Sequence, residues 1–187
     1  MERSNQSRKF PLGSQLPEFE LPDTDQTLRG SNYLRSGAAA LVVFSCNHCP
    51  YVKGTDLMLI GIAQRFSETG LRIVAINSND AVQYPEDSIE NMKLKASELS
   101  LPFPYLRDET QAVARMFDAA CTPECFLFNS SGSLVYQGAI TNRPTEPDAD
   151  RVDLLSPAIE CCLKGVEPDP NFNHPIGCSI KWRTSNA

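Results

Sequence analysis

The sequence has no excess of positive charge and no long apolar run. Its 187 residues contain 17 Lys and Arg against 23 Asp and Glu, which gives a formal net charge of -6. Nucleic acids and anionic membranes attract clustered Lys and Arg, so neither partner is expected. No stretch is apolar and long enough to cross a bilayer, and the N-terminal residues lack the apolar core of a signal peptide. We therefore expect a cytoplasmic protein.

Internal repeats are also absent, and the 41% content of hydrophobic residues is ordinary for a globular protein. This composition predicts a single domain spanning residues 1–187, with its core at about 12–165. Prolines make residues 166–187 an extended tail. The segment IGCSIKW in this tail is too apolar to be free in solvent, which predicts that the tail packs back on the domain.

Two short apolar runs, at residues 38–45 and 71–77, are typical of buried central strands. Each is followed by a helical pattern, and this alternation of strands and helices predicts an α/β fold. The full set of predicted elements is helices at 51–70, 88–99, 110–117 and 153–164, further strands at 103–109, 125–129 and 133–138, a loop at 141–150, and a lead-in of about thirty residues with at most a short edge strand.

Cysteine, in contrast, is plentiful. The sequence has seven cysteines, so at least one must be unpaired. In the cytoplasm, where structural disulfides are rare, this favours reactive thiols over a structural disulfide framework. Cys46 and Cys49 lie three residues apart where a strand meets a helix, with His48 between them. Pro50 is tolerated in a first helical turn, so the helix should begin at or just before Cys49. Unpaired N–H groups of that turn and a protonated His48 would both stabilise a reactive thiolate.

Two other interpretations of this pair remain open. Cys46, Cys49, Cys121 and Cys125 have the donor atoms of a four-thiolate zinc site, with His48 as a spare ligand. Against zinc, the segment CTPEC has a proline and a strand start where a zinc knuckle would need a flexible turn. The two cysteines could also be small buried residues without chemistry.

Other thiols and polar residues carry weaker signals. Cys161 and Cys162 are neighbours on a predicted helix and point in different directions, which predicts one core and one surface thiol. Cys178, in the tail, either folds back to resolve an oxidised thiol or packs in the interior. Asp80 is expected to cap a loop, and His174 to lie on the surface.

The chain has a strand, then CxxC at the start of a helix, and later a Thr-Pro pair that opens another strand. In this order of features it resembles the thioredoxin superfamily. The resemblance implies a central mixed β-sheet flanked by helices, with extended N- and C-terminal segments. It also implies a cis peptide bond between Thr122 and Pro123 that faces the CxxC, and it makes Cys46 the more solvent-facing thiol. Thr122 and Pro123 would then shape a substrate groove.

More closely, the chain is similar to the peroxiredoxin-related AhpC/TSA-type group. The similarity rests on the segments CNHCPYVK, AINSNDAVQYPEDS, PFPYLRDETQAVA, CTPECFLF and IGCSIKW. A peroxiredoxin has a T-x-x-C motif, in which its peroxidatic cysteine would correspond to Cys49 and its threonine to Cys46. An arginine is expected near the later strand, but Arg115 and Arg143, the nearest in sequence, do not match the pattern. The residues therefore favour dithiol chemistry.

The leading hypothesis is a thiol-disulfide oxidoreductase in which Cys46 attacks a substrate disulfide, Cys49 releases it, and His48 tunes the thiolate. Cys121, Cys125 and Cys178 are candidate auxiliary thiols. One alternative is a thiol peroxidase that uses Cys49, and another is a metal-binding or adaptor module without catalysis. The expected partners are a disulfide or peroxide substrate and a thiol reductant, and no cofactor is expected.

Overall fold

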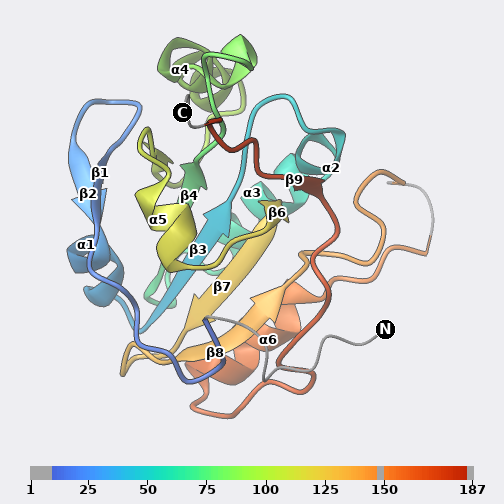
Figure 1. Ribbon diagram of the computed structural model, residues 1–187. Helices are drawn as coiled ribbons and strands as arrows, with labels where there is room; N and C mark the ends of the chain where they lie inside the picture. The colour runs from blue at the N-terminus through green and yellow to red at the C-terminus, as the bar shows by residue number, and fades with distance from the viewer. Residues whose placement is uncertain (1–9, 147–149, 185–187) are drawn as a thin grey trace.

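A five-stranded mixed sheet forms the centre of the protein in the computed structural model, which describes residues 10–146 and 150–184 (Figure 1). The strand order is β5-β4-β3-β7-β8. β4 pairs in parallel with β3 and β5, whereas β7 is antiparallel to β3 and β8. The bounds of these strands are β3 Ala39–Phe44, β4 Leu71–Asn77, β5 Tyr105–Arg107, β7 Glu124–Phe128 and β8 Leu134–Gly138.

β3 and β4 are the buried central strands that the apolar runs predict. All six residues of β3 are buried, and its register with β4 runs from Ala39 opposite Leu71 to Phe44 opposite Ile76. Successive side chains of a strand point to opposite faces, so a strand covered on both faces must be apolar throughout. Thus Leu41 and Val43 enter one core, while alternate residues of β3 enter the other.

Helices cover both faces of the sheet. α3 Asp56–Arg65, α4 Ile89–Glu98 and α6 Leu155–Leu163 contribute to the core on one face. α1 Ser31–Arg35 and α5 Ala112–Met116 contribute to the other, and Figure 1 shows α5 in front of the sheet. The predicted helices at 88–99, 110–117 and 153–164 are therefore confirmed, with ends that differ by a few residues. No helix among the described residues is long and apolar enough to cross a membrane.

The helix predicted at 51–70 is wrong as a single element. It is divided into α2 Pro50–Lys53 and α3, with Gly54 and Thr55 between them. A Cβ atom on Gly54 would lie 2.0 Å from the carbonyl oxygen of Pro144, and Arg151 donates to the Gly54 carbonyl oxygen. The close approach of Pro144 explains the break at this glycine.

The lead-in contains more structure than the sequence predicts. β1 Glu20–Pro22 and β2 Leu28–Gly30 form a hairpin, which continues into α1. Asp23 stabilises the turn by accepting a bond of 2.9 Å from Arg29. Apolar side chains of the lead-in, such as Phe10 and Leu16, are buried in the core on the α5 face. The first nine residues of the lead-in and residues 147–149 of the predicted loop lie outside the described residues.

The C-terminal tail returns to the end of the sheet near the CxxC segment. β9 Cys178–Ser179 pairs antiparallel with β6 Cys121–Thr122, so that Cys178 lies opposite Thr122. Ile180 is buried, which confirms that this part of the tail packs on the protein. In Figure 1 the red tail passes beside β6. The pairing brings together residues that are more than fifty positions apart in the sequence.

Candidate active site

Cys46 and Cys49 lie in the loop that follows β3. Cys49 is the N-cap residue of α2, with an extended backbone (φ -67°, ψ 125°), and Pro50 is the first helical residue. Proline fits this position because the N–H that it lacks would have no partner within the helix. The predicted helix start at the CxxC is therefore confirmed.

The two thiols meet at Thr122. The peptide bond between Thr122 and Pro123 is cis, as the thioredoxin resemblance implies. Sγ of Cys46 lies 3.2 Å from Oγ1 of Thr122, and Sγ of Cys49 lies 3.3 Å from its carbonyl oxygen. The structure thus brings together both predicted cysteines and the predicted Thr-Pro pair.

The expectation that Cys46 faces solvent is wrong. Cys46 and Cys49 both have 0% exposure, because the returning tail and Val52 cover them. The thiol of this cluster that retains contact with solvent is Cys178, which packs against the pair and is partly exposed.

Hydrogen bonds make Cys49 the more acidic thiol. The thiol of Cys46 donates to Cys49, which is the largest cause of a lowered pKa of Cys49, to about 4. Burial acts in the opposite direction, and the Cys178 thiol and two backbone N–H groups, of Val52 and Cys178, stabilise the thiolate further. The Thr122 carbonyl oxygen, which accepts from the neutral thiol, opposes these four donors. We therefore assign the negative charge to Cys49.

Cys46 has the opposite environment. Donation of its proton to Cys49 raises the pKa of Cys46, and burial raises it further. The nearby carboxylate of Asp87 also disfavours a thiolate at Cys46, while the hydroxyl of Thr122 partly offsets these effects. Cys46 is therefore the neutral member of the pair.

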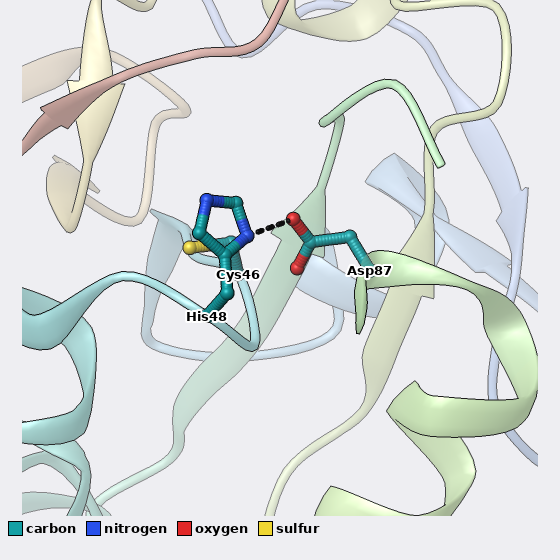
Figure 2. Close-up of side chains that lie close together, drawn as sticks. All are labelled: Cys46, His48 and Asp87. Atoms are coloured by element: carbon teal, nitrogen blue, oxygen red, sulfur yellow. Dashed lines mark hydrogen bonds and ion pairs between the residues drawn. The ribbon is translucent and has the colours of Figure 1, made fainter. Parts of the chain in front are cut away.

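His48 is held by Asp87, a residue that the sequence patterns did not single out (Figure 2). Nδ1 of His48 lies 2.6 Å from Oδ2 of Asp87, and the imidazole stacks on Tyr84 at a centroid distance of 5.2 Å. An ionised carboxylate only accepts hydrogen bonds, so Nδ1 is the donor. This leaves Nε2 as the ring nitrogen that can exchange a proton.

Asp87 is fully buried at the end of η2 Pro85–Asp87, and protein hydrogen-bond donors take the place of water around its carboxylate. Oδ1 accepts from the backbone N–H of Asn47 and the side chain of Asn77, at 2.6 and 3.1 Å. Oδ2 accepts from Asn79 at 2.9 Å in addition to His48. The segment AINSNDAVQYPEDS contains all three of Asn77, Asn79 and Asp87, but nothing in its pattern shows that they converge on one carboxylate.

Cys46, His48 and Asp87 are also a candidate metal site, because their donor atoms lie within 4.8 Å of one another. They form the one group of three such ligands found in the described residues. The carboxylate already accepts four hydrogen bonds, so an ion would have to replace the bond from His48. The set also provides three ligands, one fewer than a structural zinc site.

The alternative zinc set does not form a ligand group among the described residues, and the two candidate thiols beside Pro123 differ in their surroundings. Cys125 is buried in the apolar core with α3 and α6, and burial raises its pKa. Cys121 is buried in β6, and neither residue belongs to the cluster around Cys46 and Cys49. Burial is the main cause of the raised pKa of Cys121, and the charges of Cys49 and Cys178 contribute to it, so Cys121 lies near the thiols. The tail residue Cys178 packs directly against the pair.

The remaining candidates behave largely as predicted. Asp80 caps its loop by accepting from the N–H of Val82, and His174 is exposed. Cys161 is partly exposed and Cys162 is buried. Within the described part of the chain, Arg115 stacks on Trp182 and Arg143 pairs with Glu146, so these arginines contact partners other than the thiols.

A groove with a cavity volume of about 570 Å³ runs between α3 and α4 and reaches the CxxC loop at Asn47. Its walls include Leu57, Leu94 and Lys95. Lys95 also donates to the carbonyl oxygen of Cys46 at 3.0 Å, which fixes the loop. None of the cysteines lines this groove, so it does not open directly onto the thiols.

Comparison with known proteins places this chain in a family. Residues 12–137 match the AhpC/TSA family, whereas a search of curated proteins found no match. An uncharacterized conserved protein from Geobacillus kaustophilus is 42% identical, with a TM-score of 0.84 over 95% of both chains. A hypothetical protein from Sinorhizobium meliloti 1021 is 34% identical, with a TM-score of 0.88 over 95% of this chain and 98% of that one.

A more distant structure shares the fold alone. Peroxidoxin BcpB from Mycobacterium tuberculosis is 17% identical, with a TM-score of 0.59 over 83% of this chain and 95% of its own. Together with the mixed sheet and its helical layers, these similarities confirm the predicted thioredoxin-like α/β fold.

Proposed function

The chain belongs to the AhpC/TSA family, and on this premise we propose that it is a thiol-disulfide oxidoreductase whose redox centre is the Cys46–Cys49 dithiol. The observation that carries the proposal is the pairing of two thiols of opposite character at Thr122. Cys49 favours the thiolate and Cys46 favours the thiol. A dithiol needs this asymmetry, because one sulfur must attack while the other retains its proton for the second step.

In the proposed reaction, the pair gives two electrons to a substrate disulfide. The sulfurs of Cys46 and Cys49 form a disulfide, and the substrate disulfide is cleaved to two thiols. A thiol reductant then returns the pair to the dithiol by the reverse exchange. Because the lowered pKa of Cys49 stabilises the reduced form, the disulfide of this pair should be comparatively oxidising.

His48 and Asp87 support the second step of this exchange. When Cys46 attacks the sulfur of Cys49, it must lose its proton. Nε2 of His48 can accept that proton, because Nδ1 is occupied by the bond to Asp87. Asp87 acts as a positioning residue, since it contacts the imidazole and has no need to contact the substrate.

A thiol peroxidase is the second candidate, and the lowered pKa of Cys49 is the observation that favours it. Cys49 thiolate would attack hydrogen peroxide to form a sulfenic acid and hydroxide, and Cys46 would then form the disulfide with release of water. Among the described residues, no arginine hydrogen-bonds to the thiols. Arg107, a buried arginine near this end of the sheet, donates through Nη1 to the carbonyl oxygens of Asn77 and Asn79, and its Nη2 has no partner.

Stopped-flow mixing of the reduced protein separates the two candidates. Oxidised glutathione and hydrogen peroxide are compared on the wild type, Cys46→Ser and Cys49→Ser, with thiol states read by mass spectrometry. The oxidoreductase proposal expects a Cys46–Cys49 disulfide with oxidised glutathione and slow reaction with peroxide. Fast peroxide oxidation that persists in Cys46→Ser and disappears in Cys49→Ser would instead establish the peroxidase. Cys161→Ser is the matched control, because that thiol is partly exposed and lies on α6.

A further inference from the structure

The buried pair has no direct access to a substrate disulfide. Cys46 and Cys49 have 0% exposure, and the groove between α3 and α4 is not lined by either sulfur. An attacking thiol must approach the substrate sulfur along the axis of the disulfide bond, so a sulfur without solvent contact cannot begin the exchange. The proposed function therefore requires another group at the surface.

Cys178 has the required position. It is partly exposed, it packs against Cys49, and the two thiols share a hydrogen bond. The backbone N–H of Cys178 also donates to the Cys49 sulfur. Cys178 is therefore in contact with the buried pair on one side and with solvent on the other.

The tail holds Cys178 in place on both sides. Before it, Gly177 passes so close to Thr122 that a Cβ atom would lie 2.2 Å from the Thr122 carbonyl oxygen. After it, the N–H of Ile180 donates to Ala120 at 3.1 Å, and the N–H of Lys181 donates to Oδ1 of Asn79 at 2.9 Å. The close approach of Gly177 to Thr122 and the hydrogen bonds to two separate loops show that the tail is held in one position and does not touch the thiols by chance.

We infer that Cys178 is a third catalytic thiol, the one through which the buried Cys46–Cys49 pair exchanges with the substrate disulfide. This inference rests on the proposed function and adds the route by which electrons reach the surface. It also identifies the substrate as a disulfide that can approach a thiol at the protein surface.

The steps balance as three successive exchanges. Cys178 attacks the substrate R–S–S–R, passes its proton to the Cys49 thiolate, and forms Cys178–S–S–R with release of R–S⁻. Cys49 then attacks the Cys178 sulfur, and its proton leaves with the second R–SH, which gives a Cys49–Cys178 disulfide. Finally Cys46 attacks Cys49; its proton passes to Nε2 of His48 and from there to the departing Cys178. Two electrons pass from Cys46 and Cys49 to the substrate, and Cys178 is regenerated.

The hydrogen bond between Cys49 and Cys178 is essential to the first step. Burial and the adjacent Cys49 sulfur raise the pKa of Cys178 to about 11, so Cys178 needs a base before it can attack. The Cys49 thiolate is a base already in hydrogen-bond contact with it. In the reverse direction, a thiolate of low basicity such as Cys49 is also a good leaving group from the Cys49–Cys178 disulfide.

The first test compares the rate of Cys46–Cys49 disulfide formation with oxidised glutathione in the wild type, Cys178→Ser and Cys161→Ser. We expect Cys178→Ser to react roughly tenfold more slowly or worse, because accessible thiols dominate exchange rates, while Cys161→Ser matches the wild type. Equal rates in Cys178→Ser and the wild type would overturn the role of Cys178 and leave the proposed function standing. Failure of the wild type to form the disulfide would overturn the proposed function itself.

The second test traps the intermediate. Cys46→Ser cannot complete the third exchange, so peptide mapping after one equivalent of oxidised glutathione should find a Cys49–Cys178 disulfide. Glutathione attached to Cys49, with Cys178 still reduced, would overturn the inference because Cys49 would then have met the substrate directly.

Discussion

The carboxylate of Asp87 lies 2.6 Å from Nδ1 of His48, and the same carboxylate accepts bonds from the backbone of Asn47 and from two buried asparagines. One buried charge therefore orders the CxxC loop, its histidine and the segment after β4. The side chain of Asn79 continues this network to the tail, where its Oδ1 accepts from Lys181.

Asp87→Asn should be strongly destabilising. The amide offers one oxygen in place of two and directs an NH₂ group toward donors, so we expect a loss of about 2 to 4 kcal/mol in the free energy of unfolding, measured with urea. Exchange at the dithiol should also become slower, because His48 loses its fixed orientation. Glu86→Gln, a change at the exposed neighbour, is the control and should stay within about 0.5 kcal/mol of the wild type. Equal effects of the two substitutions would contradict the role of Asp87.

Reduced protein should contain one thiolate at pH values where ordinary thiols are protonated. An ordinary cysteine loses its charge below about pH 8.5, whereas the Cys49 thiolate should persist until the pH approaches about 4. Titration of the thiolate ultraviolet absorbance in the wild type and in Cys49→Ser measures this difference. If both proteins lose their thiolate signal together near the ordinary value, the assignment of the charge to Cys49 is wrong.

The same shift links stability to pH in the reduced protein. Because the pKa of Cys49 is lower in the folded state, its thiolate stabilises the fold fully above the unfolded-state value of about 8.5. This contribution decreases as the pH falls and is lost near the folded-state value of about 4. The unfolding free energy of the wild type, relative to Cys49→Ser, should therefore decrease between these limits, and a difference that is independent of pH would exclude the linkage.

Two glycines of the divided helix should respond in opposite directions to alanine. Gly61 is exposed within α3 with no atom near its missing Cβ, so Gly61→Ala should raise the free energy of unfolding by about 0.5 to 1 kcal/mol. Gly54→Ala would place a methyl group 2.0 Å from the Pro144 carbonyl oxygen, with an expected loss of about 1 to 3 kcal/mol. Urea denaturation of both variants is sufficient, and a stabilised Gly54→Ala would show that Pro144 does not approach Gly54 closely.

Gly177→Ala should release the tail. Its methyl group would collide with the Thr122 carbonyl oxygen, 2.2 Å away, and separate β9 from β6. Hydrogen exchange at the Ile180 amide, which donates to Ala120, should become faster, while the amides of β3 stay protected. Ser179→Ala changes an exposed side chain in the same strand and should leave the exchange pattern as it is.

Much of the sheet and the location of the dithiol could be predicted because the signals are local. Strands such as β3 are apolar throughout because both faces are covered, and a CxxC followed by proline marks the start of a helix within a few residues. The Thr122–Pro123 bond was predicted by resemblance and has the expected isomer. The break at Gly54 could not be predicted, because it depends on contact with a loop ninety residues further along the chain.

Local sequence patterns are sufficient to predict the strand-helix alternation, the position of Cys46 and Cys49 at the end of a central strand, and a tail too apolar to be free. Which thiol is charged, which one meets solvent, and which carboxylate holds His48 follow from tertiary contacts. Those properties depend on burial and on hydrogen bonds between distant segments: Asp87 is 39 residues from His48, and Cys178 reaches the pair through its pairing with Thr122. No local pattern of residue types encodes such distances, because they are set by how the returning tail packs against the end of the sheet.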